Sequence, residues 1–279
     1  MKNSVFIACF LMFVLSSCCD GRKSEANNID FKEYAMDSTY HLFGDVTKPS
    51  IKISLSMQYP VRSQNQSVLD SLQRLIMASV TANPGQAQQN PEEAMRNFIM
   101  QKIAEYRMLE SDYEDASPET RGNDFNYSFS NEYMGEERNV FNRDGIFCFS
   151  NRAYSFTGGA HGLETVVHKC VDLNNGTVIT PKDLFTGDDA ELFLTTLILE
   201  KLAEMQKVKS PEKLEEIGFF DVSSIKPGDN FFLNEKGITF VYNPYEIAAY
   251  YLGILEVFIP YGDITAILAS QSPIKRIIN

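Results

Sequence analysis

Apolar and polar positions alternate in several segments of this chain, which indicates strands with one buried face. The clearest case is IKISLSMQYPV, residues 51–61, where apolar side chains occupy every second position. Similar strand-like runs cover residues 125–135, 139–156 and 164–173, and the end of the chain reads as strand, turn, strand, corner, strand over residues 230–264.

Other segments carry apolar residues at helical spacing. These are residues 67–80, residues 91–106 behind an Asn90 cap with Pro91 at the first position, and residues 187–208. A shorter helix is expected over residues 210–219. Because strand runs and helices are segregated rather than strictly alternating, the predicted fold class is α+β, an antiparallel sheet packed against a few helices in two sequential modules.

The first residues indicate export. An apolar run over residues 5–15 follows Lys2 and is shorter than the roughly 20 residues that span a bilayer. The sequence LSSC, residues 15–18, matches the lipobox of bacterial lipoproteins, although an ordinary signal peptide with nearby cysteines is the alternative. We predict a signal peptide over 1–17, lipidation at Cys18 and a flexible tether over 18–47. No aspartate stands directly after Cys18, which favours the outer membrane, on its periplasmic or surface face.

Composition and charge narrow the function classes. The chain is 44% hydrophobic and 22% charged, as in globular proteins, and its net charge is -12. The sequence contains no lysine or arginine cluster, which argues against nucleic acid as a partner and against electrostatic binding to anionic lipid through a polybasic segment. A basic protein partner is electrostatically favoured.

The motif TGGAHG, residues 157–162, is the main candidate for chemistry. Its glycines Gly158, Gly159 and Gly162 allow a sharp bend or a close approach to a ligand, and His161 has the chemistry of a general base or a metal ligand. The sequence contains no H-E-x-x-H motif, G-x-S-x-G elbow or Walker loop. We therefore interpret the motif as a turn first and a binding loop second, and expect no cofactor and no metal.

A turn centred on Gly159 has a consequence for two cysteines. If the flanking strands fold back there, paired residue numbers sum to 318, which places Cys148 opposite Cys170. Directly opposed residues in an antiparallel pair lie about 4.5–5.5 Å apart at Cα, within reach of a disulfide. A cross-strand disulfide and two buried thiols are both open from the sequence.

A second candidate surface is the aromatic corner FVYNPYEIAAYYLG, residues 240–253. Tyrosine is enriched where proteins bind partners, because it combines apolar area with a hydroxyl group. An aromatic core with hydroxyls at its rim is the alternative. The candidate ligand-binding residues over both segments are Thr157, Gly158, Gly159, His161, Tyr245, Glu246 and Tyr250.

Three ordered motifs together resemble a known domain family. It is the extracytoplasmic domain, with its preceding small module, shared by the peptidoglycan deacetylase PdaC and the lysozyme-binding anti-sigma factor RsiV, a domain family of unknown function. The positions that carry the resemblance are Tyr154, Phe156, 157–162, Asp172, Leu173, Gly176, 183–185, 244–248 and 259–261. The resemblance implies a small α+β module over 48–128 and a C-terminal α+β domain over 129–279.

The resemblance also shapes the functional expectation. Deacetylase chemistry in that family belongs to a separate metal-binding domain, and TGGAHG is a structural signature there. The expected function is a non-enzymatic, lipid-anchored module of the cell envelope that binds a lysozyme-like protein or a cell-wall glycan. The alternative is a cell-wall hydrolase or esterase that uses His161 as its base. The sequence does not identify the ligand, the membrane face or the oligomeric state.

Overall fold

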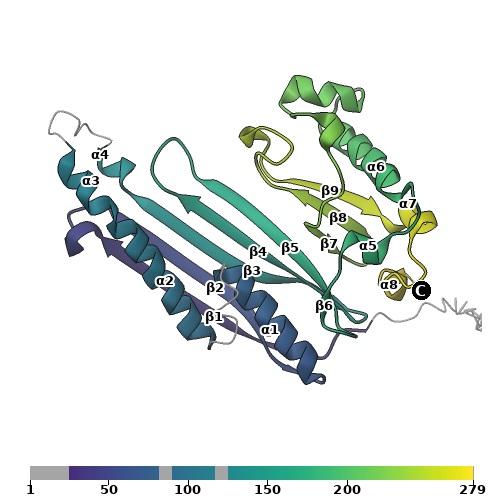
Figure 1. Ribbon diagram of the computed structural model, residues 1–279, viewed down its shortest axis with the longest axis horizontal. Helices are drawn as coiled ribbons and strands as arrows, with labels where there is room; N and C mark the ends of the chain where they lie inside the picture. Colours follow the sequence, from purple (N-terminus) through teal and green to yellow (C-terminus); the bar gives the residue numbers. More distant parts are fainter. Residues whose placement is uncertain (1–24, 82–89, 117–124, 279) are drawn as a thin grey trace, which may run out of the picture.

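The computed structural model describes residues 25–81, 90–116 and 125–278 and contains two β-sheets with helices around them (Figure 1). A six-stranded sheet has the order β1-β2-β3-β4-β5-β6, and a three-stranded sheet has the order β7-β8-β9. The α+β class predicted from the sequence is confirmed. Within the described residues, no helix is long and apolar enough to cross a membrane.

The strands of the large sheet are long except for the last. They are β1 (Ile29–His41), β2 (Ser50–Ser63), β3 (Asn131–Arg143), β4 (Ile146–Phe156), β5 (Leu163–Asp172) and β6 (Thr177–Val178). The small sheet consists of β7 (Phe231–Leu233), β8 (Gly237–Tyr242) and β9 (Leu255–Pro260).

Three long helices and several short turns complete the fold. The α-helices are α1 (Gln66–Thr81), α2 (Pro91–Arg107), α3 (Leu109–Asp115), α4 (Phe125–Ser128), α5 (Pro181–Leu184), α6 (Ala190–Met205), α7 (Tyr261–Ile264) and α8 (Lys275–Ile278). Turns of 3-10 helix are η1 (Leu42–Gly44), η4 (Pro211–Ile217), η5 (Val222–Ser224), η6 (Tyr250–Leu252) and η7 (Thr265–Ile267).

The large sheet is antiparallel at every pairing except β2 with β3, which run parallel. A parallel pair needs a crossover connection rather than a hairpin. Here the helices α1 to α4 supply that connection, and Asn90 caps α2 by accepting a hydrogen bond from the Glu92 amide, as the sequence indicates. The strand predicted from residue 125 begins only at Asn131, because α4 occupies the first part of that run.

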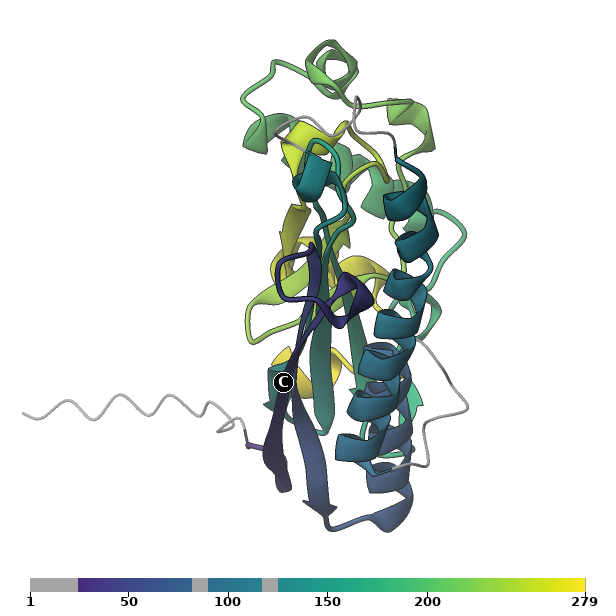
Figure 2. The ribbon, with the colours of Figure 1, turned by 90° about the vertical axis from the view of Figure 1, so that its left-hand side faces the viewer.

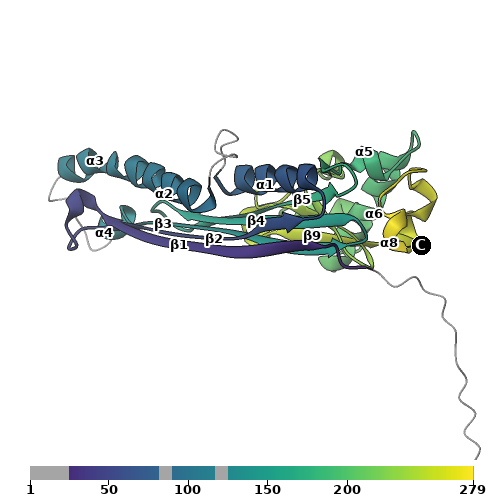
Figure 3. The ribbon, with the colours of Figure 1, turned by 90° about the horizontal axis from the view of Figure 1, so that it is seen from below.

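Helices α1, α2 and α3 lie along one face of the large sheet, as the edge-on views show (Figures 2 and 3). The apolar positions of β2 point towards them, and so do Phe147, Phe149 and Val171 from β4 and β5. A second core lies on the opposite face of β4 and β5, where Ile146, Cys148 and Cys170 pack with the small sheet and α6. One end of the large sheet is therefore covered on both faces.

Two predicted boundaries differ from this architecture. The tether predicted over 18–47 is wrong over Ile29–His41, because this segment is β1 and pairs with β2 along its whole length. Its half-buried positions include Tyr34, Met36 and Tyr40, an alternation that the polar residues between them obscure in the sequence. The module boundary predicted at 128/129 falls within one continuous sheet, since β2 pairs directly with β3. The two cores lie on opposite faces of β4 and β5.

A buried carboxyl group lies where β2 and β3 diverge. The parallel ladder ends at Met57 and Glu137, and beyond it the Gln58 amide donates a 2.8 Å hydrogen bond to a Glu137 carboxyl oxygen. The other oxygen of Glu137 is buried without a hydrogen-bond partner, as is the side-chain oxygen of Asn139. Burial raises the pKa of Glu137 to about 8, so its carboxyl group is mostly protonated near neutral pH.

Candidate functional site

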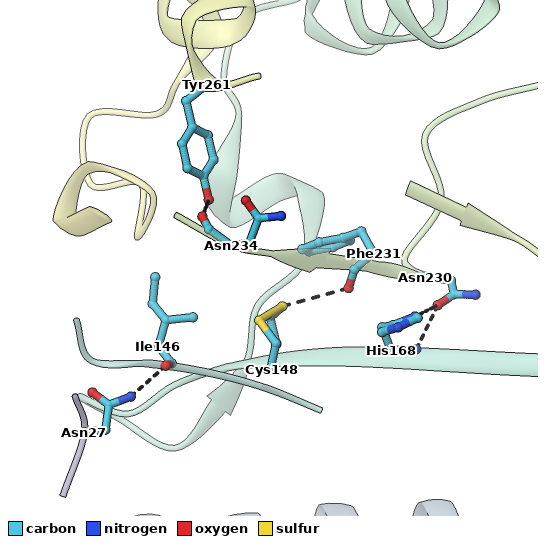
Figure 4. Close-up of a disulfide and its surroundings, with 9 residues drawn as sticks. Asn27, Ile146, Cys148, His168, Asn230, Phe231, Asn234 and Tyr261 are labelled. Atoms are coloured by element: carbon cyan, nitrogen blue, oxygen red, sulfur yellow. Dashed lines mark hydrogen bonds between the residues drawn. A yellow bond between two sulfur atoms is a disulfide. The ribbon is translucent and has the colours of Figure 1, made fainter. Parts of the chain in front are cut away.

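The TGGAHG turn joins β4 to β5 in the register that the sequence predicts. Tyr154 pairs with Glu164, Ser150 with His168, and Cys148 with Cys170, so each pair sums to 318. The two cysteines are joined by a disulfide, with their Cα atoms 4.0 Å apart, and they face the small sheet (Figure 4). The disulfide therefore lies between β4 and β5 below the turn.

Each glycine of the turn is needed for its own structural reason, either a positive φ or a close contact. Gly158 and Gly159 adopt φ values of 81° and 98°, a region that favours glycine. A Cβ atom on Gly158 would lie 2.2 Å from the Ser128 carbonyl oxygen, so the turn packs closely on α4. A Cβ atom on Gly162 would lie 2.4 Å from the Tyr154 ring. The loop is thus fixed at both ends, and its tip at Gly159 is open.

His161 and Tyr250 form an aromatic stack across the two candidate segments. Their ring centroids are 3.9 Å apart with an interplanar angle of 16°, and Tyr245 stacks on the other side at 5.7 Å from Tyr250. The Tyr250 hydroxyl donates a 2.7 Å hydrogen bond to the Gly162 carbonyl oxygen. His161 Nδ1 lies 3.1 Å from the same oxygen and therefore acts as a donor. We call the row His161, Tyr250 and Tyr245 the aromatic row.

Both ends of this row are exposed, and Tyr245 is 55% exposed. Its φ of 69° is rare for a residue other than glycine, and such conformations concentrate at ligand sites. Glu246 holds this turn, because its carboxylate accepts a 2.5 Å hydrogen bond from the Asn243 amide. Glu246 is exposed at the rim of the row rather than buried.

Two asparagines fix the aromatic corner against β5. The side chain of Asn243 accepts a hydrogen bond from the Val166 amide and donates one to the Val166 carbonyl oxygen, at 2.7 and 3.1 Å. Asn230 donates to the same carbonyl at 2.9 Å. It also accepts a hydrogen bond from the His168 amide at 2.8 Å (Figure 4). The two side chains replace the partner strand that β5 lacks there, and they orient the row.

The surroundings of His168 indicate a structural role. Its ring is buried, lies 4.7 Å from Phe232 between centroids, and faces Asn230. Burial lowers the pKa of His168 to about 4, so the ring is neutral at pH 7. The second histidine of the motif region therefore contributes to the contact between the sheets.

A polar hollow of about 390 Å³ lies beside His161. Its lining combines aromatic rings with small polar and charged side chains, namely Ser50, Lys52, Tyr127, Ser130, Asn131, Glu132, Tyr154, Phe156, His161 and Gly162. Thr157 lines a neighbouring hollow of about 480 Å³, which shares Asn131, Glu132 and Phe156 with the first and is also lined by residues of α2. The structure thus brings His161, Tyr245, Glu246 and Tyr250 together and places Thr157 in the adjoining hollow.

Several residues of the site were not predicted. Tyr154 and Tyr127 add rings to the hollow, and Asn230 and Asn243 position the corner. Tyr154 stands three residues before the motif and is among the positions that carry the family resemblance, so it could have been included on that ground. The asparagines give no signal in the sequence, because their role depends on contacts about 60 to 80 residues away.

Chemically, the site offers surfaces for contact more than groups for catalysis. The His161 ring contacts the Tyr250 ring and the Gly162 carbonyl oxygen, whereas a general base is normally oriented by a carboxylate. Within the described parts of the chain, no group of three or more histidine, cysteine, aspartate or glutamate side chains could hold a metal ion.

Comparison with known proteins assigns the chain to a family. A family model described as "Deacetylase PdaC" matches residues 46–164, and one described as "Protein of unknown function (DUF3298)" matches residues 182–262. The crystal structure of a DUF3298 family member from Bacteroides fragilis is 30% identical, with a TM-score of 0.81, over 90% of this chain and 98% of that one. The chain belongs to the DUF3298 family.

A more distant structure shows the same fold. A DUF3298 family protein from Pseudomonas aeruginosa superposes with a TM-score of 0.57 at 15% identity, over 86% of this chain and 95% of that one. No curated protein sequence matches the chain. The resemblance seen in the sequence is confirmed: this DUF3298 protein joins a PdaC-related segment to a DUF3298 segment, and the aromatic row takes His161 from the first and Tyr250 and Tyr245 from the second.

Proposed function

We propose that this DUF3298 protein is a lipid-anchored, non-enzymatic binding module of the cell envelope, and that its ligand is a cell-wall glycan. The observation that carries the proposal is the aromatic row beside a polar hollow. Sugar rings combine apolar faces with polar hydroxyl edges, so an exposed aromatic face next to hydroxyl and amide groups complements both. The anchor at Cys18, which lies outside the described residues, rests on the lipobox sequence.

Support for binding rather than turnover comes from the fixed geometry of the row. The Tyr250 hydroxyl and His161 Nδ1 both direct their hydrogen atoms at the Gly162 carbonyl oxygen, inside the protein. A prearranged rigid surface loses little entropy when a ligand binds. One family model carries the word deacetylase in its name, and it matches residues 46–164. The histidine in this range is His161. Its ring contacts the Tyr250 ring and the Gly162 carbonyl oxygen, as described above.

The net charge of -12 favours a second class of ligand, a basic lysozyme-like protein. One experiment distinguishes the two classes of ligand. Full-length protein in detergent is titrated calorimetrically with purified glycan strands of peptidoglycan and, separately, with lysozyme, at low and high salt. Saturable binding of glycan that changes little with salt supports the proposal, and binding of lysozyme alone, weakened by salt, replaces it with the protein ligand.

Three variants connect the result to the site. Tyr250→Ala and Tyr245→Ala should each weaken glycan binding by about tenfold, since stacked aromatic contacts contribute roughly 0.5–1.5 kcal/mol beyond their buried area. Met108→Ala, on an exposed part of the helical face, should leave the affinity unchanged. His161→Gln should keep the protein folded and weaken glycan binding no more than the tyrosine variants, since it removes one ring of the row. A time-dependent release of sugar ends that disappears in His161→Gln would establish the hydrolase alternative instead.

A further inference from the structure

A second hollow continues the site along the open face of the large sheet. It has a volume of about 180 Å³ and is lined by Ser54, Ser56, Met134, Gly135, Glu136, Arg152, Tyr154 and Glu164. Tyr154 also lines the hollow beside His161, so the two adjoin. The strand register places Met134 opposite Tyr154 and Glu136 opposite Arg152, on the face that the helices do not cover.

The small side chains of this groove come from β2. Ser54 and Ser56 lie beside Met134 and Glu136 of β3, and Tyr154 and Arg152 of β4 lie on the other side of those two residues. The distance along β2 from Ser50, at the first hollow, to Ser56 is about 20 Å, since a strand rises roughly 3.3 Å per residue. That length accommodates a chain of several linked rings rather than one small molecule.

The charges of the groove lie beside opposite charges. Arg152 and Glu164 form a 2.8 Å ion pair, and Glu136 forms a 2.9 Å ion pair with Arg138. Lys52 and Glu132, in the first hollow, are direct cross-strand neighbours. A surface with paired charges gives no net attraction to a polyanion or a polycation, but it offers many hydrogen-bonding groups to a neutral one.

We infer that the two hollows form one extended subsite array for a linear glycan strand of the cell wall, which they contact through its sugar rings and hydroxyl groups rather than through its charges. One end of the strand rests on the aromatic row, Tyr154 supports the middle, and the groove over Ser54 and Ser56 takes the far end. This inference rests on the proposed function and deepens it, because it specifies a polymer recognised along its length rather than a terminal sugar.

The test compares the affinities of chitobiose and chitohexaose, a short and a long neutral oligomer of the same sugar. The full-length protein should bind chitohexaose about tenfold or more tightly than chitobiose, because only the longer chain reaches the groove. Ser56→Trp fills the far end and should reduce the affinity for chitohexaose to that for chitobiose. Ser111→Trp, an exposed position of α3 on the other face, is the matched control and should preserve the difference.

A second variant keeps the test decisive if Ser56→Trp misfolds. Arg152→Ala removes an exposed donor from the groove and should weaken chitohexaose binding by about threefold with chitobiose unaffected. Equal affinities of the unmodified protein for the two oligomers, or a length preference that survives both groove variants, would overturn the inference and leave the aromatic row as the whole site. Failure of both oligomers and of peptidoglycan strands to bind would overturn the proposed function as well.

Discussion

The hydroxyl of Tyr250 donates a 2.7 Å hydrogen bond to the carbonyl oxygen of Gly162, a residue 88 positions earlier in the chain. This bond joins the loop of the large sheet to the corner of the small sheet. It also places the Tyr250 ring where His161 stacks on it. The candidate site therefore depends on the contact between two parts of the chain that different family models describe.

Tyr250→Phe tests that bond separately from the stack. Phenylalanine retains the ring, so glycan affinity should fall only about twofold, whereas the free energy of unfolding should drop by about 1 kcal/mol for the lost hydrogen bond. Urea unfolding and calorimetric titration measure the two effects. A variant as stable as the parent would show that the Gly162 carbonyl oxygen finds another donor.

The glycines of the turn provide a matched pair of variants. Gly158→Ala should lower the free energy of unfolding by about 2–3 kcal/mol and disturb binding, because the new Cβ atom meets the Ser128 carbonyl oxygen at 2.2 Å in addition to an unfavourable φ. Gly159→Ala has no atom within 4 Å of its Cβ and should cost about 1 kcal/mol. Equal losses in the two variants would mean that the loop does not pack on α4 as described.

Removal of the disulfide should destabilise the protein. Cys148→Ala with Cys170→Ala opens a covalent link between residues 22 apart, which is expected to cost about 3 kcal/mol. Thermal unfolding under oxidising conditions measures the loss. Under strong reductant the parent and the variant should differ only by the small packing change, so a full difference there would assign the effect to packing instead.

Glu137→Gln should change how stability depends on pH. In the native protein the pKa of Glu137 is raised from 4.5 to about 8, so the folded state binds more protons between those values. Stability is therefore highest below about pH 4.5, falls as the pH rises towards 8 and then levels off. The glutamine variant should lack this decline and be more stable than the parent at about pH 9, as urea unfolding across the range would measure. The same decline in parent and variant would contradict the assignment.

His168 should produce the opposite dependence. Its pKa is lowered from 6.5 to about 4, so the unfolded state binds more protons between those values, and stability is lost as the pH falls through that window. His168→Gln should flatten this part of the profile, while His41→Gln, at the end of β1, should preserve it. Since the contributions of His168 and Glu137 oppose each other near pH 5, each is best measured as a difference between parent and variant.

Local patterns in the sequence were sufficient for the fold class, the main helices and the register of the turn. The 318 pairing follows from one assumption, that the chain reverses at Gly159, and the structure confirms all three pairs named above. Strand β1 was not predicted, because an edge strand with one half-buried face has a weak alternation in which Asp37 and Thr39 separate the buried positions. The parallel pairing of β2 and β3 depends on a crossover that no local pattern reveals.

The candidate site, like the fold, could be predicted from local sequence only in part. His161 and Tyr250 were predicted to belong to one contact surface, but their direct stacking arises from the packing of the small sheet on β5 and was not predicted. Thr157 shares the motif with His161 but lines the neighbouring hollow, because the turn between β4 and β5 places the two residues on different sides of the loop. Sequence proximity therefore identified the segment but not which of its side chains act together.

The side chains that occupy the outer edge of β5 have a consequence for association between molecules. An unpaired strand edge invites strands from neighbouring molecules and promotes aggregation or domain swapping. On β5 the backbone groups of Val166 and His168 are engaged by Asn230 and Asn243, and the Cys170 carbonyl oxygen accepts from the Ile179 amide. A second copy of the protein therefore finds little free backbone to pair with along this edge.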